Sequence, residues 1–202
     1  EGEVTVANII LQVGGKLDVT VEDSSGVSVY NSYATASGPI YGYCYTDVNG
    51  TCEIKRLLNG TYDVSANPPY GVNLLSNSTI ALVFLGEVTV TNIVLFKGGV
   101  LTGFVTEVNG DPIYNAYVTV SDPTYEYCYT DVNGNYTIIR LQTGHYVVTT
   151  YPPYDLNLGE NSTSVDITAG ETTILNITLP RNGMLRGFVK FGNGTHVAGA
   201  EI

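Results

Sequence analysis

Apolar and polar residues alternate along most of the chain, as in strands that bury one face. Ala116, Val118 and Val120, for example, are interleaved with Tyr117 and Thr119. No stretch of a dozen residues has the 3.6-residue period of an amphipathic helix. Turn-forming Gly, Pro, Asn and Asp separate the runs at intervals of roughly 8 to 12 residues, the spacing typical of sandwiches. The pattern predicts an all-β chain of short strands.

The alternation repeats with a period of 84 residues. Gly2–Leu17 returns without a gap at Gly86–Leu101 and again at Gly170–Leu185. This period is longer than a solenoid unit and suits a small self-contained domain. We therefore expect two complete antiparallel β-sandwiches of about seven strands each, residues 14–97 and 98–181.

The two ends of the chain match parts of a repeat. Residues 1–13 match its close, so we interpret them as the last strand of a preceding repeat. Residues 182–202 match its opening and end inside an apolar run, which predicts the first strands of a following, truncated repeat. Unpaired apolar strands are open sheet edges. Either the polypeptide continues in both directions or neighbouring molecules donate strands, and both alternatives give a head-to-tail array.

The charge balance is strongly acidic. The chain has 8 Lys and Arg against 19 Asp and Glu, for a formal net charge of −11. The basic residues are scattered and form no stripe for phosphates, so nucleic acid is not an expected partner. No apolar run reaches the roughly 18 residues of a membrane helix, so we expect no membrane-spanning segment.

The sequence contains seven Asn-x-Ser/Thr sequons. Asn77 and Asn161 occupy the same position in the two repeats. Asn, Ser and Thr also gather in β-turns for conformational reasons. We nevertheless expect covalent N-glycans and no other cofactor, and therefore an extracellular or cell-surface location. The sequons are Asn49, Asn59, Asn77, Asn135, Asn161, Asn176 and Asn193.

Catalytic motifs are missing from the sequence. His145 and His196 stand at non-equivalent positions, and neither lies in a motif with Ser, Cys or a carboxylate. The nucleophile elbow, the zinc-protease helix motif and the phosphate-binding glycine loop do not occur. We expect a protein that is not an enzyme.

One motif has a weak resemblance to a metal site. Asp47 and Asn49, with their counterparts Asp131 and Asn133, resemble the first half of a calcium loop. The acidic residue that closes such a loop is missing in both copies, and a hairpin turn explains the same residues. We predict no metal site, with calcium as the weaker alternative.

The cysteines flank the first of these turns. If its loop has three residues, Cys44 and Cys52 face each other and can form a disulfide across a hairpin. A loop of two or four residues changes the parity and places Tyr45 on the face of Cys52. Cys128 has no such partner, because Tyr136 stands where Cys52 is expected.

The same register decides where two tyrosine ladders point. A three-residue loop directs them outward, as an aromatic surface suited to stacking sugars or a neighbouring domain. The alternative is that they fill a core that lacks Trp and has only 5 Phe. The ladders consist of Tyr41, Tyr43, Tyr45 and Tyr125, Tyr127, Tyr129.

The second repeat carries motifs of a known family. It reads G-F-V-T from Gly103, N-G-D-P-I from Asn109, Y-T-D from Tyr129 and A-G-E-T-T from Ala169. Over Gly98–Pro180 it resembles the carboxypeptidase regulatory-like domain, a transthyretin-like sandwich related to the Cna-B modules of surface proteins. The resemblance implies an immunoglobulin-like or transthyretin-like fold and supplies no catalytic residue.

The first repeat departs from that pattern, since Val27-Ser28-Val29 stands where Asp-Pro-Ile is usual and Ser32-Tyr33-Ala34 replaces Ala-x-Val. Only Phe96–Gly99 separates the last strand of the first repeat from the first strand of the second, which predicts an extended and semi-rigid joint. We expect a structural segment of an extracellular filament, stalk or surface-layer array whose partners are copies of itself. The alternative is a set of carbohydrate-binding or adhesive accessory domains of a larger secreted protein.

Overall fold

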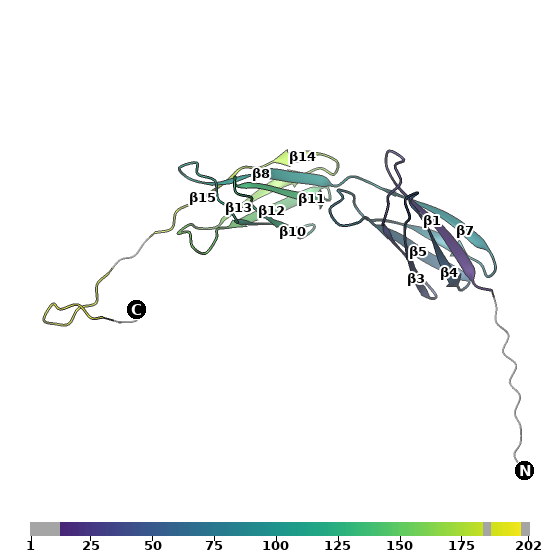
Figure 1. Cartoon of the computed structure of the whole chain (residues 1–202), viewed down its shortest axis with the longest axis horizontal. Coiled ribbons are helices and arrows are strands. Elements are labelled where there is room, and N and C mark those ends of the chain that lie inside the picture. Colours follow the sequence, from purple (N-terminus) through teal and green to yellow (C-terminus); the bar gives the residue numbers. More distant parts are fainter. Residues whose placement is uncertain (1–12, 184–186, 199–202) are drawn as a thin grey trace, which may run out of the picture.

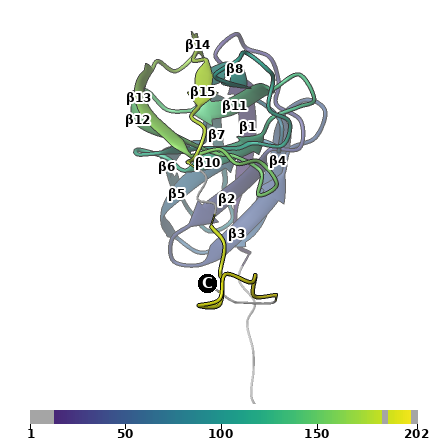
Figure 2. The same cartoon turned by 90° about the vertical axis from the view of Figure 1, so that its left-hand side faces the viewer.

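The computed structural model describes residues 13–183 and 187–198, and all the regular structure in these ranges is β. Figure 1 shows two sandwiches that follow one another end to end along the long axis of the chain. Viewed along that axis, one sandwich lies behind the other (Figure 2). Within the described ranges, no helix is long and apolar enough to cross a membrane. The predicted all-β sandwich fold is confirmed.

The first sandwich has seven strands in two sheets. One sheet has the order β4-β1-β7 and the other β3-β2-β5-β6. The strands are β1 (Gly15–Asp23), β2 (Tyr33–Ser37), β3 (Tyr41–Tyr45), β4 (Thr51–Leu57), β5 (Gly60–Asn67), β6 (Asn77–Val83) and β7 (Val88–Leu95).

The second sandwich repeats this plan. Its sheets have the orders β11-β8-β14 and β10-β9-β12-β13, and β15 also pairs with β8. The two short strands β14 and β15 together take the place of β7. The strands are β8 (Gly99–Glu107), β9 (Tyr117–Ser121), β10 (Glu126–Tyr129), β11 (Asn135–Leu141), β12 (Gly144–Tyr151), β13 (Asn161–Ile167), β14 (Thr172–Ile174) and β15 (Ile177–Leu179).

Two expectations about strand pairing were wrong. The sheets are not purely antiparallel, because the last strand of each domain pairs with the first strand in parallel, as β7 does with β1. The segment around Asp47–Gly50 is not a hairpin within one sheet. Strand β3 stays with β2, where Tyr45 pairs with Tyr33, whereas β4 pairs with β1 from Thr51 onward. The turn therefore carries the chain from one sheet to the other.

Each sandwich has its own core, built from the inward positions of the alternating strands. Leu17 and Tyr62 in the first domain are fully buried, as are their counterparts Leu101 and Tyr146 in the second. The sandwiches lie within the expected ranges 14–97 and 98–181.

The sequence predicts parts of further repeats at the two ends of the chain. The expected strand in residues 1–13 lies outside the described residues except for Val13. In the described part of residues 182–202 no strand is assigned, and an isolated bridge joins Lys190 to His196. The truncated repeat expected there stays a prediction.

Candidate functional site

The six ladder tyrosines lie on the outer face of the four-stranded sheets. Their side chains are 55 to 62% exposed. Alternation places them there, because their paired strands β2 and β9 direct small or branched residues such as Ala34 and Val118 into the core. Of the two alternatives, the structure therefore shows the outward ladder.

Additional tyrosines that sequence reasoning missed extend each ladder. Tyr33 on β2 stacks on Tyr45 with ring centroids 5.0 Å apart, and Tyr117 on β9 stacks on Tyr129 at the same distance. The Tyr33 and Tyr41 hydroxyls lie 2.7 Å apart. Tyr33 could have been assigned to the ladder from its pairing with Tyr45, but that pairing becomes known only once the register of β2 and β3 is known.

The second domain forms a groove beside its ladder. Tyr151 at the end of β12 adds another ring, 6.2 Å from that of Tyr117. The groove has a volume of about 1210 Å³. Tyr117, Tyr125 and Tyr151 contribute to its lining, together with the acidic residues Asp155 and Glu160. The corresponding first-domain positions of Tyr151, Asp155 and Glu160 hold Asn67, Gly71 and Ser76.

Hydrogen bonds between tyrosine hydroxyls raise the pKa of one tyrosine in each ladder. The hydrogen bond between Tyr117 and Tyr125, 2.8 Å long, raises the pKa of Tyr117 to about 12. The hydrogen bond of Tyr33 to Tyr41 likewise raises the pKa of Tyr33. Aromatic rings with hydroxyl groups at their tips provide a surface that can both stack and form hydrogen bonds.

The cysteines are divided between the two domains. Cys44 and Cys52 are joined as a disulfide with Cα atoms 5.9 Å apart, and the bond links β3 of one sheet to β4 of the other. It therefore connects the two layers of the sandwich instead of crossing a hairpin. Cys128 is a half-buried free thiol, and burial raises its pKa to about 11.

The Asp-Val-Asn-Gly motifs are turns whose carboxylates are occupied. Asp47 Oδ1 accepts hydrogen bonds from the backbone N–H groups of Asn49 and Thr51, both at 2.9 Å. These bonds, that of Thr51 first, lower the pKa of Asp47. Asp131 has the same arrangement with Asn133 and Asn135. No group of three or more His, Cys, Asp or Glu able to hold a metal occurs in the described ranges.

Six of the seven sequon asparagines are exposed, and Asn161 is half-buried. The Nδ2 atoms of Asn77 and Asn161 each donate to a carbonyl of the last strand region, at Val94 and Thr178, over 2.8 Å. An N-linked sugar replaces one of the two Nδ2 hydrogens, so one remains for this bond. The two equivalent sites thus have the same local geometry.

The histidines lie apart. His145 Nδ1 is 2.8 Å from Asp166 Oδ1, with side chains 66% and 89% exposed, so this is a surface pair of small energetic effect. The ring of His196 packs edge-on against Phe188, 5.2 Å away. The structure does not bring the two histidines into one described cluster.

The joint between the domains is ordered by the side chain of Asn73. Its Nδ2 donates to the Gly98 carbonyl (2.8 Å), and its Oδ1 accepts from the backbone N–H of Arg140 in the second domain (2.8 Å). The Arg140 guanidinium lies over the Tyr70 ring, 5.7 Å from its centroid. The loop Tyr70–Asn73 of the first domain is thus held against the second, a contact that sequence reasoning did not predict.

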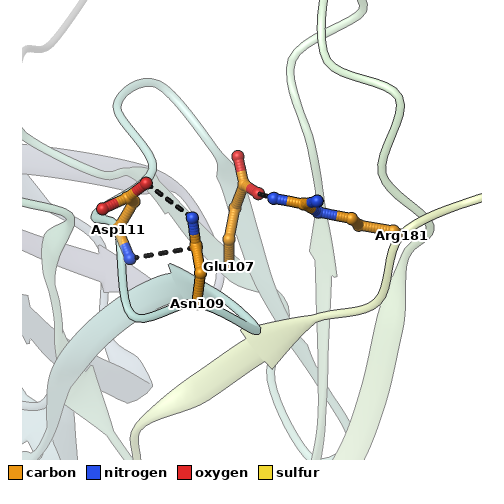
Figure 3. Close-up of polar contacts among 4 residues, drawn as sticks. All are labelled: Glu107, Asn109, Asp111 and Arg181. Atoms are coloured by element: carbon orange, nitrogen blue, oxygen red, sulfur yellow. Dashed lines mark hydrogen bonds and ion pairs between the residues drawn. The ribbon is translucent and has the colours of Figure 1, made fainter.

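The segment that leaves the second domain has some of the contacts of the joint between the domains, but not all of them. Figure 3 shows Arg181, just after β15, paired with Glu107 of β8 at 3.0 Å, beside the Asn109–Asp111 turn. Asn157 corresponds to Asn73, and its Nδ2 donates to the carbonyl of Asn182 (3.3 Å). Asn182 stands where the first joint has glycine, and its own Nδ2 donates to Leu158.

Comparison with known proteins supports the fold. Residues 100–180 match the family model of the carboxypeptidase regulatory-like domain. No curated protein matches the chain. The chain is similar to the solved minor pilin of the Gram-positive pathogen Streptococcus agalactiae, at 14% identity and a TM-score of 0.53, covering 88% of this chain and 100% of the pilin.

Two further structures are similar at low identity. A streptococcal ancillary pilin aligns at 12% identity and a TM-score of 0.50, over 84% of this chain and 62% of that one. The Bacillus anthracis TIE protein aligns at 17% identity and a TM-score of 0.41, with 93% of this chain spanning 41% of its length. At identities this low the two pilins, with TM-scores of 0.53 and 0.50, show the fold alone. The family match thus covers the second repeat, and the first repeat is a second sandwich of the same plan.

Proposed function

We propose that this chain is a structural segment of an extracellular filament, stalk or surface-layer array built from tandem, glycosylated β-sandwiches. The observation that carries the proposal is the joint, where a three-residue connection, Phe96–Gly98, and the Asn73 side chain hold one sandwich against the next. A short, hydrogen-bonded joint transmits tension and orientation along an array, whereas a long flexible linker does not.

Other observations agree with this role. Minor and ancillary pilins share the fold. A net charge of −11 keeps an exposed array soluble through mutual repulsion. The proposal includes no catalytic activity. It is tested by immunogold electron microscopy of the native cell surface with antibodies against residues 14–181. Labelled linear structures support it, and labelling of the cell interior alone contradicts it.

The glycan part of the proposal concerns Asn77 and Asn161 first. They are equivalent, they lie at the starts of β6 and β13, and their amides keep one hydrogen for the bond to the last strand. Glycopeptide mass spectrometry of native material should find both sites occupied. Finding both bare would remove the main support for a sugar-coated surface protein.

The groove of the second domain favours a second candidate function, carbohydrate binding. The tyrosines that line it can stack against sugar rings, and the carboxylates of Asp155 and Glu160 can accept hydrogen bonds from sugar hydroxyls. A glycan array probed with the purified chain tests this function. Tyr129→Ala should abolish binding, whereas the matched Tyr45→Ala in the first domain should leave it unchanged. Equal effects of the two substitutions would contradict a site in the groove.

A further inference from the structure

The contact at the joint has two parts. The docking loop, Tyr70–Asn73, belongs to the first domain. The docking surface belongs to the second and consists of Gly98 and the bulge in β11 at Arg140. The loop supplies one amide side chain that both donates to and accepts from the docking surface.

The bulge and the glycine depend on each other. Between its pairings with Leu101 and Gly99, β11 contains an extra residue, and Arg140 there has φ of +65°. A Cβ on Gly98 would lie 2.6 Å from Arg140 Cα and 2.9 Å from Asn73 Oδ1. Only glycine lets the strand, the bulge and the docking loop approach this closely.

The first domain has the same docking surface without an occupant in the described residues. Arg56 also has φ of +65° in an equivalent bulge, and a Cβ on Gly14 would lie 2.6 Å from Arg56 Cα. Arg56 is exposed and Gly14 half-buried, whereas Arg140 is half-buried and Gly98 buried. The surface at Gly14 and Arg56 therefore has its shape without a docked loop. The occupied surface at Gly98 and Arg140 differs in being more buried.

The second domain has the matching docking loop, Tyr154–Asn157, and no domain among the described residues is docked against it. Asn157 is exposed, and within the described ranges its Oδ1 accepts no hydrogen bond. The segment that follows carries Asn182 in place of Gly98, so it lacks the glycine on which the close approach depends. Among the described residues, the unoccupied surface that has both the glycine and the bulge is the one at Gly14 and Arg56.

We propose that the Gly14–Arg56 surface binds the Tyr154–Asn157 loop of a second copy of this chain, head to tail. The inference rests on the proposed filament role and names the contact that would extend it. In this contact the Arg56 N–H donates to Asn157 Oδ1, as the Arg140 N–H does to Asn73. A contact between two different surfaces of the same molecule does not close and generates a linear array.

The contact is weak between separate molecules. At the internal joint the short connection keeps the docking loop near its surface at an effective concentration of about millimolar or above. Between separate molecules, the concentration of the chain itself has to reach that range. Binding between separate molecules should therefore require chain at about millimolar concentration.

The experiment is a nuclear magnetic resonance titration of the full chain. A ¹⁵N-labelled chain is mixed with unlabelled chain up to about 2 mM, and the backbone amide of Arg56 is followed. We expect a progressive shift at Arg56 and Gly14. Unlabelled Asn157→Ala chain should bind about tenfold more weakly, the effect of one lost hydrogen bond.

An internal reference comes from Asn73→Ala. In the spectrum of ¹⁵N-labelled Asn73→Ala, the Arg140 amide should be shifted relative to the unsubstituted chain. That shift shows how the amide of an unoccupied surface differs from that of an occupied one. Unlabelled, it should still shift Arg56 of the labelled chain. An Arg56 amide that does not move, or that moves equally with Asn157→Ala, overturns the docking contact even if native filaments exist. The Arg56 shift without native filaments would overturn the filament role and keep the contact.

Discussion

Substituting Gly98 with alanine tests how the joint is built. The added Cβ would meet Arg140 Cα at 2.6 Å, the Arg140 carbonyl carbon at 2.9 Å and Asn73 Oδ1 at 2.9 Å. Ordinary contacts begin near 3.4 Å, so the first strand and the bulge must separate by about 0.8 Å. Most of the opposing atoms are backbone, which cannot rotate away.

The expected cost has two components. Overpacking at a rigid site lowers the free energy of unfolding of the second domain by about 1–3 kcal/mol. Displacement of the Asn73 side chain also removes the hydrogen bonds of the joint, each contributing about 0.5–1.5 kcal/mol. Hydrogen exchange by mass spectrometry resolves the two domains, and residual dipolar couplings report their relative orientation.

Gly14→Ala is the matched control. Its Cβ would meet Arg56 Cα and its carbonyl carbon at the same 2.6 and 2.9 Å, but no docking loop lies beside it in the described residues. It should destabilise the first domain by a similar amount and leave the orientation of the domains unchanged. If the two substitutions change that orientation equally, the joint is not held by the contact described here.

Three further predictions concern the individual domains. The hydroxyl of the buried Thr130 accepts a hydrogen bond from the Ala116 N–H and donates one to a backbone carbonyl. Thr130→Val should therefore lower the free energy of unfolding of the second domain by about 2–4 kcal/mol, measured by urea denaturation, and Thr130→Ser should lower it much less. Hydrogen bonds from Lys16 and Lys55 lower the pKa of Glu53 to about 2, below its value of 4.5 in the unfolded chain. The stability that the ionised Glu53 contributes is therefore complete above pH 4.5 and is lost as the pH falls toward 2. Glu53→Gln should flatten that pH dependence of the first-domain unfolding midpoint, and an unchanged profile would refute the assignment. Reduction of the Cys44–Cys52 disulfide should lower the free energy of unfolding of the first domain by about 2.5 kcal/mol and leave the second unaffected, as measured by denaturation with and without reductant.

Much of the fold was readable from local pattern. The 84-residue recurrence separates the domains, and alternation such as Val118–Thr119–Val120 assigns strands and their inner faces. Because side chains alternate strictly along a strand, Tyr41, Tyr43 and Tyr45 were expected on one face, but whether that face points outward or into the core stayed open. These features depend on residues a few positions apart, which a sequence shows directly.

Other features depend on contacts between distant segments. Nothing local indicates that β7 pairs with β1 in parallel, or that the turn after Tyr45 changes sheets. The groove requires Tyr151 and Glu160 to meet a ladder that is far away in sequence. Asn73 is a single residue in a polar loop, and only its recurrence as Asn157 could have marked it.

The central claim, a head-to-tail array of these sandwiches, is tested most directly by the mass of the native particle that carries this sequence. Mass photometry or analytical ultracentrifugation of material released gently from the source should show species of many times 21.6 kDa, the mass of this chain. Electron microscopy of the same fractions should show linear particles with a repeat of roughly 30 Å or somewhat more, the length of one nine-residue strand plus the joint. A monodisperse monomer of about 21.6 kDa before glycosylation would contradict the account.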